Sequence, residues 1–297
     1  MDKIENIYKR YILLYVKGLG VGAANSVPGV SGGTIALITG ILEELLDSFR
    51  LISPKNIKLF FTGKFKTFWD TVNGNFLLSV GLGIVTGLIL LASIVVKMLN
   101  TYPVAIWSFF FGLIVISTIS TLKTIRKFTI PVFIVFVAGA AIALLITIMP
   151  IAQTPDSLLL VFICGAVAIC AMILPGISGA YILLLMGKYE YIINAVTDLK
   201  MGILAVFTGG AIIGLLSFSH FLSWLLRRYH DITISLLAGF MFGALNKVWP
   251  WKKTVDSVTE VNYLPSVDEH LFVGIASAAA AIAIFMTIEF LGNRKTK

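Results

Sequence analysis

A helix-breaking hexapeptide occurs twice in this chain, at positions 147 residues apart. Residues 28–33 read Pro-Gly-Val-Ser-Gly-Gly, and residues 175–180 read Pro-Gly-Ile-Ser-Gly-Ala. A glycine and then a glutamate follow each copy at the same spacing: Gly40 and Glu43 in the first copy, Gly187 and Glu190 in the second. Proline and glycine interrupt helices, and both copies lie within apolar sequence. The chain must therefore fold around two breaks at corresponding positions of two halves.

The composition is that of a membrane protein. Hydrophobic residues make up 58% of the 297 residues, charged residues make up 13%, and the mean hydropathy is +0.96. A soluble protein of this length could not bury so much apolar surface. A helix needs about 20 apolar residues to cross the hydrocarbon core. Three stretches reach that length, 75–99, 203–226 and 270–292, and four shorter ones are further candidate spans, 102–121, 130–149, 157–174 and 231–247.

The basic residues predict how the chain is oriented. With the N-terminus in the cytoplasm, 17 of the 23 Lys and Arg residues fall on the cytoplasmic side, and the C-terminus lies there too. The loop 47–74 is then cytoplasmic and amphipathic, with lysines interleaved among Phe and Trp residues. We expect it to lie on the anionic inner surface of the membrane. Glu44 and Asp47 are expected to pair with cations of this loop.

The duplication extends beyond the hexapeptide. At an offset of 127 residues, three glycines of the first half match three of the second: Gly83, Gly87 and Gly112 with Gly210, Gly214 and Gly239. The GxxxG spacings indicate close helix packing. Each half, about 11–149 and about 157–292, then holds one broken helix pair and three spans. We therefore predict an all-α polytopic membrane protein, a single transmembrane domain over 1–297 built from two inverted-topology repeats. We expect the broken pairs, 11–27 with 31–46 and 157–174 with 177–187, to be re-entrant, although full crossings would give the same orientation.

Broken helices at corresponding positions are typical of transporters whose binding site lies at the bilayer midplane. Ser31 and Ser178 are placed to cap the helices that follow them, which would leave the N–H groups of 32–34 and 179–181 facing a cavity. Such helix starts attract anions. The alternative is a pair of kinked helices packed tightly through glycine. The candidate binding residues are Asn25, Ser26, Gly29, Ser31, Gly32, Gly33 and Thr34 in the first copy, and Gly176, Ser178, Gly179, Ala180 and Tyr181 in the second.

Charged residues near the motifs have two interpretations each. Glu43 and Glu190 are candidates for proton coupling, or they mark the interfacial ends of their half-helices. Lys17 is a candidate head-group contact, or it extends to the membrane surface. Cys164 and Cys170 fall on different faces of one helix and are expected to be buried fillers. No metal site, cofactor or nucleic-acid partner is predicted, because the histidines are scattered and no metal-ligand spacing occurs.

The duplicated Pro-Gly-[Val/Ile]-Ser-Gly motif, with Ala24-Asn25 before the first copy and Gly40-x-x-Glu43 after it, resembles the polyprenyl-phosphate translocase family of bacteria, the PopT-type undecaprenyl-phosphate flippases. The resemblance covers essentially the whole chain. It implies a multi-pass protein of the bacterial plasma membrane that returns undecaprenyl phosphate from the outer to the inner leaflet for reuse in cell-wall synthesis, with or without ion or proton coupling. It implies a polyprenyl-phosphate lipid and the phospholipid bilayer as partners, leaves a homo-oligomer open, and implies no enzyme activity.

Two alternatives stay open. Membrane undecaprenyl-pyrophosphate phosphatases also have inverted repeats and a related Pro-Gly-x-Ser motif. An arginine follows their serine, whereas Gly32 and Gly179 follow Ser31 and Ser178 here. Hydrolysis would also need a nucleophile, a base and a charge clamp that these residues do not supply. The other alternative, a secondary transporter of another anion, keeps the fold and changes the cargo.

Overall fold

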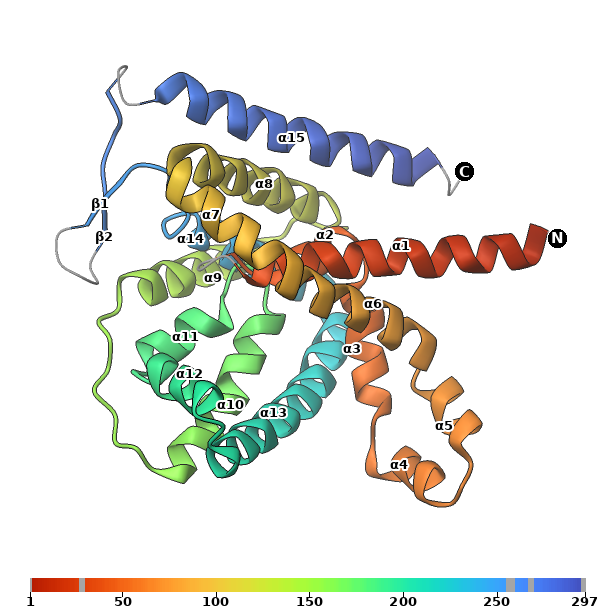
Figure 1. Ribbon diagram of the computed structural model, residues 1–297. Helices are drawn as coiled ribbons and strands as arrows, with labels where there is room; N and C mark the ends of the chain where they lie inside the picture. The colour runs from red at the N-terminus through yellow and green to blue at the C-terminus, as the bar shows by residue number, and fades with distance from the viewer. Residues whose placement is uncertain (1, 27–29, 255–259, 267–269, 295–297) are drawn as a thin grey trace.

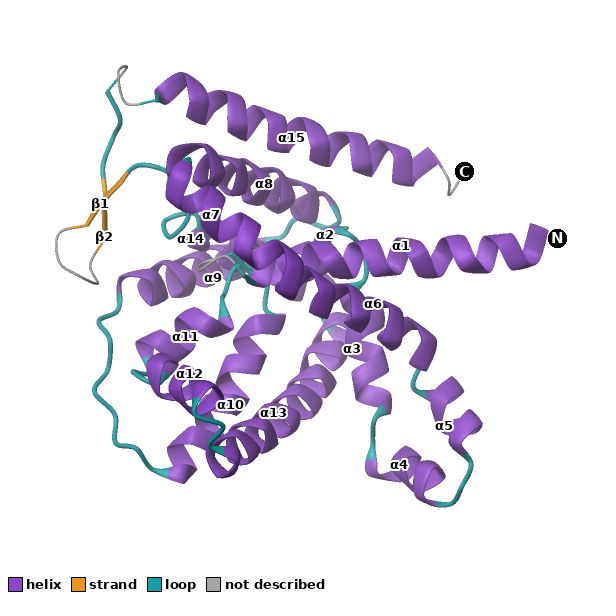
Figure 2. Cartoon of the chain, viewed as in Figure 1, coloured by secondary structure: helices purple, strands orange, loops and turns teal. Residues whose placement is uncertain are grey.

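The computed structural model describes residues 2–26, 30–254, 260–266 and 270–294, and most of them are helical (Figure 1; Figure 2). The first half contains α1 (Asp2–Asn25), α2 (Gly32–Ile38), α3 (Leu42–Leu51), α4 (Pro54–Phe61), α5 (Phe65–Thr71), α6 (Gly74–Thr86), the π-helical turn η1 (Gly87–Leu91), α7 (Ala92–Thr101), α8 (Pro103–Lys123) and α9 (Ile130–Ile148). The second half contains α10 (Leu158–Ile173), α11 (Gly179–Leu185), α12 (Tyr189–Thr197), α13 (Met201–Arg228), α14 (His230–Ala244), β1 (Lys252–Thr254), β2 (Glu260–Asn262) and α15 (Leu271–Arg294).

Several helices are suited to a bilayer. Among the described residues, four helical segments are long and apolar enough to cross a membrane: Gly74–Thr101, Pro103–Lys123, Ile130–Ile148 and Met201–Arg228. Three more apolar helices are shorter: Leu158–Ile173, His230–Ala244 and Leu271–Thr287. The predicted class, an all-α membrane protein, is therefore confirmed.

The long helices pack in pairs that correspond between the halves. In the first half α1 packs against α6 and η1, and in the second α10 packs against α13. The last two helices of each half pack against the other half instead, because α8 lies beside α15 and α9 beside α14 (Figure 1). This exchange joins the two halves into one helical body.

Glycines hold these pairs in close contact. A Cβ atom at Gly83 would meet the backbone carbonyl of Tyr15 on α1, and one at Gly210 would meet the carbonyl of Phe162 on α10. The glycines four residues further on, in η1 and α13, lie against the same partner helices. Close packing through the GxxxG spacings is therefore confirmed, since only a residue without a side chain lets the backbones approach this closely.

The glycine after each hexapeptide ends a short helix. Gly40 has φ +70° and Gly187 has φ +65°, conformations that disfavour other residues. The next N–H group in each copy reaches back across the helix end, from Ile41 to the carbonyl of Ala36 and from Lys188 to the carbonyl of Leu183, both at 2.9 Å. The arm expected over 31–46 is therefore two helices, α2 and α3, because this cap stops the first of them.

Two surface elements lie outside the helix pairs. The predicted loop 47–74 begins inside α3 and continues as α4 and α5, which have no buried residue and expose Phe60 and Phe61. The stretch after α14 contains an antiparallel hairpin of β1 and β2, which the sequence analysis did not predict. In Figure 1 the start of α1 and the end of α15 lie toward one side of the molecule, and this hairpin lies toward the opposite side.

Candidate functional site

Each hexapeptide contacts a residue directly beside the other one, between the halves. The hydroxyl of Ser31 donates a hydrogen bond of 2.8 Å to the carbonyl of Leu174. The N–H of Gly176 donates one of 3.0 Å to the hydroxyl of Thr34. Ser31 and Thr34 are buried. Each copy of the motif therefore provides part of the other's hydrogen bonding.

The backbones of the two copies also touch. A Cβ atom at Gly33 would meet the carbonyl of Ile173 just before the second break. Ser26, a predicted binding residue, donates from its hydroxyl to the carbonyl of Ala23 at 2.6 Å and so satisfies the end of α1. Gly29, another predicted binding residue, lies outside the described residues.

The first N–H groups of α2 are bound within the protein. The N–H of Gly32 donates to Oδ1 of Asn25 at 2.9 Å, and the N–H of Gly33 donates to the hydroxyl of Ser31 at 3.1 Å. The N–H of Thr34 donates to the carbonyl of Ser31. The expectation that these groups face a cavity is therefore wrong for this structure, because two candidate binding side chains cap the helix. Nδ2 of Asn25 is buried with no hydrogen-bond acceptor in the part of the chain that is described.

The second copy is less enclosed than the first. Ser178 caps α11 by accepting a hydrogen bond of 3.4 Å from the N–H of Tyr181. Gly179 is buried, and a Cβ atom there would lie 2.5 Å from the carbonyl of Ala168. Ala180, which corresponds to the buried Gly33, is exposed.

A narrow pocket lies beside this second copy. It is lined by the polar side chains of Thr147, Ser178, Tyr181 and Lys247 and by Ala143, Ile146, Gly176 and Ile177. The hydroxyl of Tyr181 donates to the carbonyl of Thr147 at 3.1 Å, and Nζ of Lys247 lies 4.9 Å from the centre of the Tyr181 ring. Sequence reasoning missed Lys247, because only the packing of α14 against α9 brings the chain after α14 to the motif.

Lys17 supports the end of the first short helix. Its ammonium group donates a hydrogen bond of 2.7 Å to the carbonyl of Thr39, the last residue before Gly40. At the same position of the second copy, the carbonyl of Met186 accepts from the hydroxyl of Thr154 at 2.6 Å. In this structure Lys17 therefore neutralises a helix end, a contact that neither sequence interpretation included.

The two cysteines are free thiols, with Cys164 buried and Cys170 half-buried. Cys164 occupies the position of the second half that corresponds to Lys17. Within the described ranges, no group of three or more His, Cys, Asp or Glu side chains is placed to hold a metal ion.

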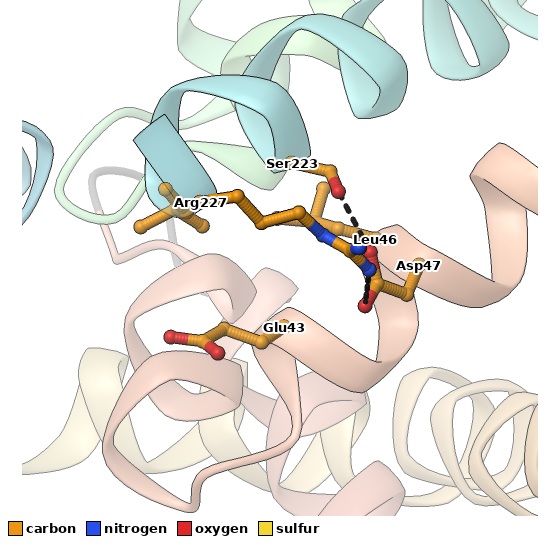
Figure 3. A pocket seen from close by; sticks show the side chains of 6 residues that line it. Glu43, Leu46, Asp47, Ser223 and Arg227 are labelled. Carbon is orange, nitrogen blue, oxygen red and sulfur yellow. Dashed lines mark hydrogen bonds and ion pairs between the residues drawn. The ribbon is translucent and has the colours of Figure 1, made fainter. Parts of the chain in front are cut away.

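The two predicted coupling glutamates lie at the starts of the amphipathic helices. Glu43 is in the first turn of α3, Glu190 is in the first turn of α12, and both are exposed. Glu43 lines a second pocket together with Asp47, Ser223 and Arg227 (Figure 3). This pocket lies where α3 packs against α13 of the other half.

Polar side chains tie α3 to α13 in this pocket. Asp47 accepts a hydrogen bond of 2.7 Å from the hydroxyl of Ser223 and one of 2.5 Å from the guanidinium of Arg227 (Figure 3). Arg50 lies 3.6 Å from the same carboxylate. Burial raises the pKa of Asp47, but the hydrogen bonds from Ser223 and Arg227 and the charges of both arginines hold it below its ordinary value. The expected pairing of Asp47 with a loop cation is seen, and the bond to Arg227 adds a link between the halves.

The matching seam of the second half is not packed in this way. Leu42 and Leu46 of α3 are each 1% exposed, whereas Tyr189 and Ile193, at the corresponding positions of α12, are 40% and 46% exposed. Across the described residues, no packing comparable to that of α3 on α13 joins α12 to α6 or α7. We define the contact of α3 with α13 as the first seam, and the corresponding faces of α12 and α7 as the second seam.

Comparisons with known proteins identify one family for this chain. A family described as undecaprenyl phosphate translocase-like matches residues 21–263. A protein of Vibrio cholerae named polyprenyl-phosphate transporter is 47% identical over 245 residues, which cover 82% of this chain and 80% of that protein. A protein of Staphylococcus aureus with the same name is 29% identical over 255 residues, 79% of this chain and 85% of that protein. No solved structure matches.

The matched region contains both hexapeptides, the short helices α2 and α11 that follow them, and both pockets. The residues of both hexapeptides and of both pockets therefore lie in the part of the chain that matches the family, whereas Lys17 lies before it. This chain is a member of the undecaprenyl phosphate translocase-like family.

Proposed function

We propose that this chain transports polyprenyl phosphate, returning undecaprenyl phosphate from the outer to the inner leaflet of a bacterial plasma membrane. Membership of the family and the names of both relatives support this cargo. The contact between the two hexapeptides is the observation that carries the proposal. A site formed equally by both halves is one that a motion between the halves can expose to either leaflet.

The packing supports the inverted-repeat arrangement. The same order of helices occurs in both halves, and the pairs α1–α6 and α10–α13 use glycines at matching positions. A seven-residue helix is about 10 Å long, roughly a third of the hydrocarbon thickness, so α2 and α11 suit re-entrant segments that end near the midplane. Figure 1, with the start of α1 and the end of α15 toward one side, agrees with two cytoplasmic termini.

The unequal seams support alternating access. The first seam is closed by buried leucines and by Asp47, while the second leaves its matching side chains exposed. In the predicted topology the first seam is cytoplasmic, and from this we infer a state closed toward the cytoplasm. We call the two hexapeptides, with Thr34 and Tyr181 beside them, the tips. Transport then requires the first seam to open and the second to close, while the tips keep hold of the phosphate.

The tips offer suitable groups for a phosphate. Hydrogen bonds already join the two copies of the motif, through the hydroxyls of Ser31 and Thr34 and the N–H of Gly176. A lipid phosphate that entered between the copies would take over these hydrogen-bonding groups. The buried Nδ2 of Asn25 adds a donor. The hydrocarbon tail stays in the bilayer, so only the head group needs a polar path.

Removing both motif hydroxyls tests the proposal. We expect Ser31→Ala combined with Ser178→Ala to lower the transport of undecaprenyl phosphate in reconstituted vesicles by about tenfold or more, since each lost hydrogen bond to a charged group is worth roughly 1.5–3 kcal/mol. Ser79→Ala is the matched control, because the hydroxyl of Ser79 bonds only within its own helix, to the carbonyl of Asn75. Normal transport by the double variant at normal expression would contradict the proposal.

An enzymatic alternative has a direct test. Both relatives are named transporters, and the residues at the tips offer hydroxyls and amides without an adjacent arginine in the sequence. Purified protein should release no phosphate from undecaprenyl pyrophosphate, and release at a catalytic rate would favour the phosphatase class. Proton coupling through Glu43 or Glu190 stays a prediction, which Glu43→Gln and Glu190→Gln test through the pH dependence of transport.

A further inference from the structure

The pocket beside the second hexapeptide contains one lysine, and the structure holds this lysine in a defined place. Lys247 follows α14, and its N–H donates to the carbonyl of Ala244 at 2.9 Å. Its own carbonyl accepts a hydrogen bond from the ammonium group of Lys252 at 2.5 Å. The ring of Tyr181 lies against its ammonium group. The backbone of Lys247 is therefore fixed, and its ammonium group lies by the Tyr181 ring in the pocket that Ser178 also lines.

The neighbouring residue fixes the same segment to α9. Nδ2 of Asn246 donates to the hydroxyl of Thr147 at 2.7 Å, near the end of α9. Nδ2 of Asn262, in β2, donates to the carbonyl of Asn246 at 2.8 Å. The end of α9, the turn after α14 and the β hairpin thus form one hydrogen-bonded unit around the pocket. A lysine in such a unit has a restricted position, whereas a lysine on a free loop would not.

The lining of the pocket combines two chemistries. One part offers the Lys247 ammonium, the Ser178 hydroxyl and the Tyr181 ring, and the other part offers the apolar side chains of Ala143, Ile146 and Ile177. A phosphate monoester on a hydrocarbon chain needs this combination: a cation and a hydroxyl for the phosphate, and apolar side chains for the first carbons of the chain. An inorganic anion would use only the first part.

We propose that Lys247 and Ser178 receive the phosphate head group of the lipid when it enters from the side of the second seam. This inference rests on the proposed function and adds the cation that the motif residues lack. The ends of α9 and α14 form the pocket, and the predicted topology places both ends outside the cell. Head groups therefore reach Lys247 from the outer leaflet before they reach Ser31 and Thr34.

Binding of three probes to the purified full chain tests the role of the charge. The probes are undecaprenyl phosphate, uncharged undecaprenol and inorganic phosphate. We expect Lys247→Gln to weaken binding of undecaprenyl phosphate by about tenfold or more, and to leave undecaprenol binding unchanged, because only the phosphate uses the cation. Lys247→Arg should retain most of the affinity. Lys253→Gln is the matched control, since Lys253 lies on β1, in the hairpin that contacts the turn of Lys247, is exposed and does not line the pocket.

Chemical protection of the wild-type chain provides a test that needs no variant. Undecaprenyl phosphate should slow acetylation of Lys247 several-fold, as measured by mass spectrometry, and should leave Lys253 unchanged as an internal control. Equal affinity of Lys247→Gln and wild type, equal losses for Lys247→Gln and Lys253→Gln, or a lack of protection would each overturn the inference while leaving the proposed function intact. A wild-type chain that binds no undecaprenyl phosphate would refute the proposed function and this inference together.

Discussion

The amphipathic helices α3 and α12 follow equivalent short helices, yet they have different surroundings. Both begin two residues after a glycine with positive φ, and both carry a glutamate in the first turn. Leu46 of α3 is buried against α13, whereas the corresponding Ile193 of α12 is 46% exposed. Related sequences have therefore produced the same local structure with unequal tertiary contacts. The difference shows that the two halves are not packed symmetrically, which is what a transporter stopped in one of its two states requires.

The largest difference between the seams should come from their apolar side chains. Leu46→Ala removes a fully buried side chain and is expected to lower the free energy of unfolding by roughly 2–5 kcal/mol. Ile193→Ala, at the matching position, should cost less than about 1 kcal/mol because that side chain is already exposed. Unfolding of both variants in mixed micelles measures the difference, and equal losses would show that the seams are packed alike.

Substitutions at the two tips should also be more costly to stability in the first half than in the second. Gly33→Ala places a Cβ atom against the backbone carbonyl of Ile173, which cannot move as a side chain can, so we expect a loss of roughly 1–3 kcal/mol and impaired transport. The matching position, Ala180, already has a Cβ atom and is exposed. Ala180→Gly should therefore cost only about 0.5–1 kcal/mol, from backbone entropy. Thermal stability and vesicle transport check both. Gly81→Ala is the control, since a Cβ atom there meets nothing within 4 Å.

The ion pair of the first seam should have a smaller effect. Asp47 and Arg227 are partly exposed, and such pairs contribute roughly 0.2–1 kcal/mol. Arg227→Asp should favour opening of the first seam through repulsion from Asp47, and Asp47→Arg combined with Arg227→Asp should restore closure. Accessibility of a cysteine placed at Leu46 measures the opening. A double variant that stays as open as the single variant would show that the charges do not hold the seam.

The smallest expected effect is a dependence of first-seam closure on pH. The pKa of Asp47 in the folded protein lies below its ordinary value of 3.8. The charged carboxylate therefore stabilises the closed seam fully at pH values above 3.8. This stabilisation should be lost as the pH falls through the lowered pKa. Accessibility of the Leu46 cysteine should therefore rise at the acid end of a titration, and the rise should be absent in Asp47→Asn.

The sequence was sufficient for features that depend on local chemistry and on the duplication. The matched glycines predicted helix contacts that the structure confirms, and α1 and α10 end just before the two hexapeptides, as proline and glycine require. The end of α2 at Gly40 was missed, because a glycine within an apolar run reads equally well as a packing residue. Helix boundaries were otherwise close to the predicted spans.

The site itself could be predicted only in part. Ser31 and Thr34 were named, but their bonds to the second copy depend on how the halves meet. Lys247 and Arg227 lie far along the chain from the residues they approach, and no local pattern marks them. Long-range packing decides such contacts, and the duplication indicates only that two copies exist, without saying how tightly each seam closes.

Distances across both seams test the proposed alternating access most directly. In a chain with Cys164 and Cys170 replaced by alanine, one pair of spin labels joins α3 to α13, at Phe49 and Arg228, and a second pair joins α7 to α12, at Met98 and Ile193. Pulsed electron paramagnetic resonance then measures both distances in lipid nanodiscs as undecaprenyl phosphate is added. Alternating access predicts a population in which the first distance lengthens while the second shortens. Distances that stay fixed, or that lengthen together, would contradict it.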